Sequence, residues 1–243
     1  MRMMTFVRRN FKEILRDPLN LAFLFGFPIV LLLLLSAIQA NIPVSMFEIG
    51  HLSPGIAVFG LAFMTLFSAT LIAKDRQSSF MHRLYTTPMT PADFILGYTL
   101  PLLPIALIEG AACYLFAVIL GLKISIHILL SLLFLLPIAL LYIAIGLLCG
   151  SVLNDKQVGG ICGALLTNLS AWLSGIWFDL DLVGGAFKEV AYALPFVHAV
   201  ELERAVLSGR ISEAFPHLWW VLGYAAVTLT AAILLFLRQM KKQ

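Results

Sequence analysis

The sequence predicts an all-α integral membrane protein with six transmembrane helices. Of its 243 residues, 61% are hydrophobic and 12% are charged, whereas a soluble domain has roughly 45–50% apolar and about 25% charged residues. Apolar runs of about 20 residues recur along the chain, and each is long enough to cross a hydrocarbon core of roughly 30 Å. Because each run must satisfy its own backbone hydrogen bonds in lipid, we expect helices rather than barrel strands, which would alternate.

The expected spans leave little chain for a soluble domain, so residues 1–243 are predicted to form a single transmembrane domain. Three starts pair a capping side chain with a following proline, at Asp17-Pro18, Ser53-Pro54 and Thr90-Pro91. A signal peptide is the alternative for the first run, but that run exceeds the usual core of roughly 7–15 residues. The six spans are Leu19–Ala40, Pro54–Ala73, Ala92–Leu120, Ile126–Leu148, Val158–Phe178 and Leu218–Leu237.

The basic residues predict that both termini face the cytoplasm. With this orientation the inner segments hold twelve Lys and Arg residues and the outer segments four, as the positive-inside rule requires. The formal net charge of +3 therefore reports topology and does not indicate nucleic-acid binding. Cys113, Cys149 and Cys162 lie within or at the edges of spans, where packing is the simplest role.

Two segments outside the spans have amphipathic helical patterns. Residues 2–16 carry apolar side chains on one side and basic ones on the other, which is typical of an elbow helix lying flat at the inner leaflet. Such a helix anchors the first span and could also touch a cytoplasmic partner. The outer loop, Asp179–His217, has two short helical pieces, Ala186–Ala193 and Phe196–Leu207, separated by Leu194-Pro195. This pattern suits a hairpin dipping into the outer leaflet, or a surface loop with interfacial helices.

Several intramembrane residues are candidates for function. Glu109 is the only acid deep in an expected span, and it could bind a proton, a cation or a cationic substrate, or simply hydrogen-bond to another helix. The pairs Gly146/Gly150 and Gly159/Gly163 permit close helix contact. An amphipathic pocket could form between the second and fifth spans, although a packed interface would have the same sequence; its residues would be Phe63, Met64, Phe67, Asn168 and Trp172.

Other kinds of chemistry have weaker support. Ser174-Gly175, with His198 and His217 beyond it, permits the hypothesis of an intramembrane serine protease, which needs the serine and its base within hydrogen-bond reach. Both histidines fall in the expected outer loop rather than in a facing helix. The sequence contains no G-x-x-x-x-G-K-[ST] motif, so we expect no P-loop ATP site in this chain. Its histidines and cysteines have no zinc spacing.

The segment from Lys74 to Pro91, KDRQSSFMHRLYTTPMTP, is a polar island between two long apolar runs. A charged segment rich in Ser, Thr and Pro must lie in water, and its end indicates a short helix that stops before a new one. Thr90 and Asp93 fit a capping box at the start of that new helix. A chain that lies almost entirely in the membrane, yet has one polar segment of this length, is expected to present that segment to a partner protein.

The order of these features resembles the membrane subunit of type-2 ABC transporters over essentially the whole chain. In that family the inner segment is similar to E-R-E-x-G-T-x-E-R-L-x-x-T-P-x-S, followed by I-L-x-G-K, and an L-P-x8-R element precedes the last span. Leu194-Pro195 and Arg204 match that last element. Ser78, His82 and Tyr98 depart from the family pattern. The inner frame is kept by Asp75-Arg76, Ser79, Arg83-Leu84, Thr87-Pro88, Thr90 and Ile95-Leu96-Gly97.

The resemblance implies that residues 74–91 form a coupling helix seated in a groove of a separate ATP-binding subunit. Two permease copies, identical or homologous, would work with two such ATPases in the lipid of the bacterial cytoplasmic membrane. The partner would bind ATP and Mg²⁺, so this chain is expected to be no enzyme and to need no cofactor. The expected contacts to the ATPase are Asp75, Arg76, Phe80, Arg83 and Leu84, with Arg8, Arg9 and Lys12 from the elbow helix.

The resemblance also implies export of a hydrophobic or amphiphilic substrate, either drug-like or lipid-linked. Two alternatives from other classes stay open. An ion-coupled secondary carrier would depend on Glu109, and an intramembrane serine protease would depend on Ser174.

Overall fold

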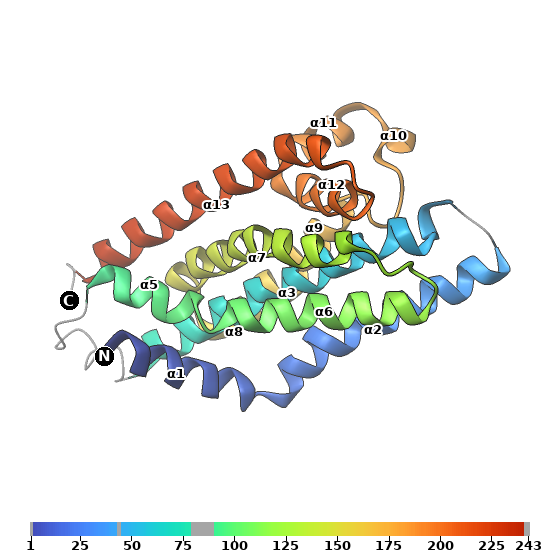
Figure 1. Ribbon diagram of the computed structural model, residues 1–243. Helices are drawn as coiled ribbons and strands as arrows, with labels where there is room; N and C mark the ends of the chain where they lie inside the picture. The colour runs from blue at the N-terminus through green and yellow to red at the C-terminus, as the bar shows by residue number, and fades with distance from the viewer. Residues whose placement is uncertain (1, 43–44, 79–89, 241–243) are drawn as a thin grey trace.

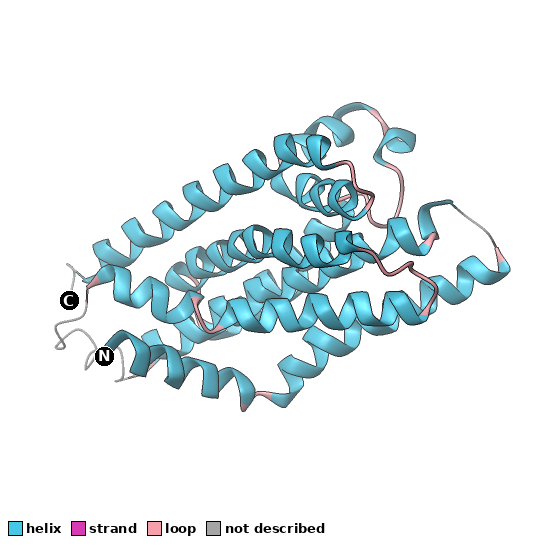
Figure 2. Ribbon diagram, viewed as in Figure 1, coloured by secondary structure: helices cyan, strands magenta, loops and turns pink. Residues whose placement is uncertain are grey.

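The computed structural model describes residues 2–42, 45–78 and 90–240, which form a bundle of helices (Figure 1). Figure 2 shows helices joined by loops, and the described residues contain no strand. In chain order the elements are α1 (Arg2–Leu15), α2 (Pro18–Asn41), η1 (Ser45–Phe47), α3 (Ile49–Gln77), α5 (Pro91–Thr99), α6 (Leu102–Ile119), α7 (Ile126–Val152), α8 (Asp155–Val158), η2 (Gly159–Leu166), α9 (Thr167–Trp172), α10 (Leu180–Val183), α11 (Gly185–Ala193), α12 (Pro195–Leu207) and α13 (Ile211–Met240).

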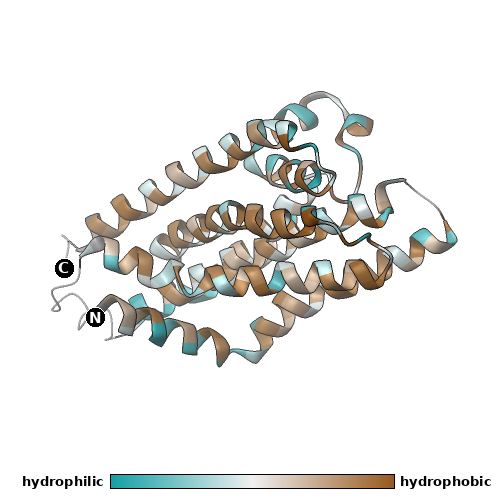
Figure 3. Ribbon diagram, in the orientation of Figure 1, coloured by the Kyte–Doolittle hydropathy of each residue, from teal (hydrophilic) through white to brown (hydrophobic). Residues whose placement is uncertain are grey.

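The all-α fold is confirmed, and five helical stretches among the described residues are long and apolar enough to cross a membrane. They correspond to the first four predicted spans and the sixth. In Figure 3 the long helices are mostly hydrophobic, while hydrophilic residues gather on α1 and around α10 to α12. The five stretches are Pro18–Asn41, Ile49–Gln77, Ala92–Ile119, Ile126–Val152 and Ile211–Arg238.

The predicted fifth span, Val158–Phe178, has different bounds in the structure. A helical run begins at Asp155, passes through the π-helix η2, and ends with α9 at Trp172. The following residues turn away, and Gly175 has a φ of +69°, a conformation that glycine adopts without the steric penalty of a side chain. The run is therefore shorter than the five spanning stretches, and the six-span topology stays a prediction.

Two of the three predicted helix starts are confirmed. The Asp17 side chain accepts a hydrogen bond from the backbone N–H of Asn20, at 3.2 Å. At the start of α5 the Asp93 N–H donates to Thr90 Oγ1 at 3.3 Å, and the Thr90 N–H donates to an Asp93 carboxylate oxygen at 2.8 Å. The start at Ser53-Pro54 is wrong because α3 already begins at Ile49. A proline so near a helix start removes only one intrahelical hydrogen bond, so the helix continues through it.

Two further boundaries differ from prediction. A turn at Leu100-Pro101 separates α5 from α6 within the third span, since Pro101 has no N–H to continue the helix. The last helix begins at Ile211 instead of Leu218, which shortens the outer loop. The two predicted pieces of that loop are present as α11 and α12. Most side chains of α12 are buried, so this helix packs inside the bundle against α3, α7 and α13.

The core is centred on α3, which packs along α7. A Cβ atom at Gly150 would lie 2.6 Å from the Ala69 carbonyl oxygen, and one at Gly146 would collide with Ser68 and the Thr65 backbone. This close approach lets Thr65 Oγ1 donate to the Tyr142 carbonyl at 3.0 Å. The first predicted glycine pair is thus confirmed as a helix contact. In the second pair Gly163 meets Leu66, whereas Gly159 faces open space.

Candidate functional site

Asp75, near the end of α3, is the centre of a polar cluster that also includes α1 and α5. Its side chain is 2% exposed. Arg9 donates to both carboxylate oxygens, at 2.6 and 2.7 Å, and the Tyr98 hydroxyl donates to one of them at 2.9 Å. Bidentate pairs of this kind are among the strongest hydrogen bonds in proteins. Burial alone would lower the pKa of Arg9, but the hydrogen bonds and the charge of Asp75 outweigh burial and raise that pKa.

We call Asp75, Arg9 and Tyr98 the Asp75 cluster. Neighbouring contacts extend it along α1 and α5. The Asn10 side chain donates to the Gly97 carbonyl at 2.9 Å. The Phe6 ring packs edge-on against Tyr98, with ring centroids 5.0 Å apart, and any side chain at Gly97 would collide with Phe6. The helices before and after the polar segment are therefore both joined to α1.

The residues predicted to contact an ATPase fall into three groups: some are bonded within the bundle, some are exposed on α1, and some lie outside the described residues. Asp75 and Arg9 are joined inside the cluster, and a carboxylate that is 2% exposed has little surface to offer a partner. Arg76 donates to the Gly150 carbonyl at 2.8 Å, which fastens α3 to α7. Arg8 and Lys12 are exposed on the other side of α1. Phe80, Arg83 and Leu84 lie outside the described residues.

The predicted pathway residues do not meet in one pocket within the single chain. Phe63, Met64 and Phe67 are buried in the core of α3; the Phe63 ring packs edge-on against Phe27 of α2, with centroids 6.0 Å apart. Asn168 and Trp172 are exposed on the outward side of α9. The Asn168 side chain donates to the Ala164 carbonyl at 2.7 Å.

Glu109 lies where α2, α3 and α6 meet. It is fully buried, and a side chain at Gly60 of α3 would collide with its carboxyl group. One oxygen accepts a hydrogen bond from the Cys113 thiol at 3.1 Å. The other oxygen has no hydrogen-bond partner among the described residues.

A second buried carboxyl group, Glu203 of α12, was not anticipated from the sequence. The Tyr114 hydroxyl of α6 donates to it at 2.9 Å, and both side chains are fully buried. The sequence pattern placed Glu203 in the outer loop, within the second helical piece, Phe196–Leu207.

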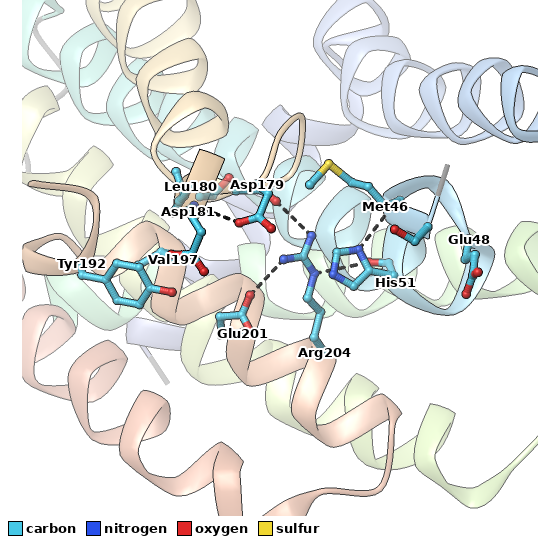
Figure 4. A pocket seen from close by; sticks show the side chains of 13 residues that line it. Met46, Glu48, His51, Asp179, Leu180, Asp181, Tyr192, Val197, Glu201 and Arg204 are labelled. Carbon is cyan, nitrogen blue, oxygen red and sulfur yellow. Dashed lines mark hydrogen bonds and ion pairs between the residues drawn. The ribbon is translucent and has the colours of Figure 1, made fainter. Parts of the chain in front are cut away.

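A polar cavity of about 550 Å³ opens beside α12, and Figure 4 shows Arg204 at its centre. The Arg204 guanidinium donates to Glu201 at 2.9 Å, to the Gly175 carbonyl at 3.0 Å and to the His51 carbonyl at 3.4 Å. It thereby ties α12 to the start of α3 and to the linker before α10. These hydrogen bonds give the arginine of the L-P-x8-R element a structural role. The cavity is lined by Ser45, Met46, Glu48, His51, Ser174, Gly175, Asp179, Leu180, Asp181, Tyr192, Val197, Glu201 and Arg204.

The structure does not assemble a serine protease site from Ser174 and the two histidines. The Ser174 hydroxyl donates to the Ala171 carbonyl at 2.9 Å. His198 and His217 instead face each other, with 2.8 Å between their Nδ1 atoms, and His198 Nε2 lies 3.0 Å from the Tyr192 carbonyl. Since a carbonyl only accepts, Nε2 of His198 carries the hydrogen and His217 donates between the rings.

The described residues contain no group of three or more His, Cys, Asp or Glu side chains arranged to hold a metal ion. Among the described residues, the geometry is that of a helical membrane protein with a buried polar cluster where α1, α3 and α5 meet. A family model described as ABC-2 type transporter matches residues 1–207. The chain therefore belongs to the ABC-2 type transporter family, and its membrane domain is that of a transport subunit. No curated protein matches the chain.

Proposed function

We propose that this chain is the permease subunit of an ATP-driven exporter in a bacterial cytoplasmic membrane. Two copies, or one copy and a homologous chain, would work with two ATP-binding subunits that hold ATP and Mg²⁺. Its N- and C-termini would face the cytoplasm, on the side of the Asp75 cluster. The family generally works with ABC ATP-binding subunits, and the sequence has no P-loop of its own, so the energy of ATP must enter through contact.

The observation that carries this proposal is the attachment of both flanks of the polar segment to one buried cluster. Asp75 lies at the start of the segment and Tyr98 follows its end, and the Asp75 carboxylate joins Tyr98 to Arg9. A displacement of residues 74–91 by an ATPase would therefore reach α1, α3 and α5 together. Closure of the ATPases would shift the permease pair between inward- and outward-open forms, as a rigid-body change of helix packing.

In this scheme the ATPase contacts divide into two groups. Phe80, Arg83 and Leu84 supply the direct surface, whereas Asp75, Arg76 and Arg9 hold that surface against the bundle. Substrate would pass between the two permeases, where Asn168 and Trp172 are exposed to a partner copy. Leu165, Leu169 and Trp172 are exposed apolar side chains of the same stretch, and they suit a hydrophobic or amphiphilic molecule, drug-like or lipid-linked.

Copurification with an ATPase tests the class of the protein. Loss of ATPase stimulation in variants of residues 74–91 tests whether this segment couples the two subunits. Gentle extraction from the native membrane should recover a P-loop ATPase in stoichiometric amount. Arg83→Glu and Leu84→Asp should remove the stimulation of that ATPase while the variants elute normally on size exclusion. Lys123→Glu, an exposed basic residue between α6 and α7, is the matched control. Unchanged stimulation in both variants would contradict the assignment of the coupling segment.

A further inference from the structure

A cavity of about 260 Å³ lies where α1, α2 and α3 meet, and it is lined by basic, acidic and apolar side chains. Arg16 of α1 and Lys74 of α3 supply the basic side chains. Ile14, Phe67 and Leu71 line the same cavity. Basic groups beside apolar side chains complement the anionic headgroup and the hydrocarbon chains of an inner-leaflet phospholipid.

Two acidic residues also line this cavity, and neither carboxylate is bonded to Arg16 or Lys74. Glu13 forms an ion pair with Arg9 at 2.6 Å, and Asp17 accepts hydrogen bonds from the backbone and side chain of Asn20 at 3.2 and 2.8 Å. In contrast, the exposed side chains of Arg16 and Lys74 have no ion pair or hydrogen bond to the described residues. The Arg16 guanidinium and the Lys74 ammonium therefore keep donors available to an anion at this cavity.

The faces of α1 indicate how the cavity lies relative to lipid. Phe6 and Ile14 are buried against the bundle. On the adjoining side Met4 is 60% and Leu15 is 52% exposed. The remaining side is basic: a second hollow is lined by Arg8, Arg9, Lys12 and Arg16, with Thr5 and Glu13. Exposed apolar residues next to a basic edge are the pattern of a helix at a membrane surface.

We propose that Arg16 and Lys74 bind the phosphate of an anionic phospholipid, with the first carbons of its chains against Phe67 and Leu71. Lys12 continues the positive edge toward neighbouring headgroups. This inference uses the orientation given under the proposed function, but it does not depend on an ATPase partner. It assigns the free basic residues of α1 to lipid, while Arg9 serves the Asp75 cluster.

Native mass spectrometry of the purified full chain, titrated in mixed micelles with phosphatidylglycerol or phosphatidylcholine, tests the site. We expect phosphatidylglycerol to be retained in preference. Arg16→Gln with Lys74→Gln should weaken that retention by about 25-fold, since each basic residue near an anionic surface contributes about fivefold, or about 1 kcal/mol. Higher ionic strength should weaken it further. Arg16→Lys with Lys74→Arg should preserve it.

The matched control is Lys156→Gln, because Lys156 is an exposed basic residue of α8, a helix that packs on α3. It should leave lipid retention unchanged. Equal retention of the two lipids, or no loss in the double Gln variant, would overturn the proposal. So would displacement of the lipid by equimolar inorganic phosphate, which would indicate a site for free anions. Loss of ATPase copurification from the double Gln variant in micelles without phosphatidylglycerol would assign these residues to the ATPase instead.

Discussion

Replacing Asp75 with asparagine tests whether one buried carboxylate holds α1, α3 and α5 together. The amide still accepts from Tyr98, but it removes the negative charge opposite Arg9. Breaking a fully buried ion pair costs about 3–5 kcal/mol. The Arg9 side chain is 34% exposed and keeps Glu13 at 2.6 Å, so water and Glu13 recover part of that loss. We expect the free energy of unfolding to fall by about 2 kcal/mol.

A double-mutant cycle with Arg9→Gln isolates the pair. Unfolding of the four proteins is followed in mixed micelles by tryptophan fluorescence while the fraction of denaturing detergent rises. We expect a coupling energy of about 1–2 kcal/mol, within the range for residues in one polar network. Lys12→Gln, an exposed change on the same helix, should stay within about 0.5 kcal/mol of the parent. Strict additivity of Asp75→Asn and Arg9→Gln would refute the reasoning.

Three further substitutions test the packing of α3 against α7, the hydrogen bonds of Arg204 and the role of the buried Glu109. Gly146→Val should cost about 1–3 kcal/mol of unfolding free energy because its side chain would collide with α3; Gly223→Ala, which meets nothing within 4 Å, is the control in the same unfolding assay. Arg204→Lys should speed limited proteolysis of the linker at Gly175, because a lysine ammonium cannot reproduce the planar guanidinium that donates to three acceptors. Unchanged cleavage would argue against a role of Arg204 in holding this linker. Glu109→Gln should preserve ATP-dependent transport, since an amide also accepts the Cys113 hydrogen bond; loss of transport in a folded variant would support the ion-coupled carrier.

Local signals in the sequence located most helices but not all of their ends. The capping groups Asp17 and Thr90 gave correct starts because a cap acts within one turn of its helix. Ser53-Pro54 carries the same signal, yet α3 begins earlier, since the packing that stabilises a long helix extends it past a proline. The end of the fifth helical run was missed for a related reason. It depends on a turn at Gly175, and Arg204 on α12, far along the chain, binds the carbonyl of that glycine.

Composition and the order of local patterns were enough to predict the membrane class, the all-α fold, the family and the position of the polar segment. The roles of the charged residues depend instead on how the helices pack. Asp75 and Arg9 read as surface contacts in the sequence but pair with each other across the bundle, while Arg16 and Lys74 stay free beside a cavity. Glu203 read as a loop residue but is fully buried beside Tyr114. Such roles depend on which helix faces meet, and a linear pattern specifies the faces of a helix without specifying their partners.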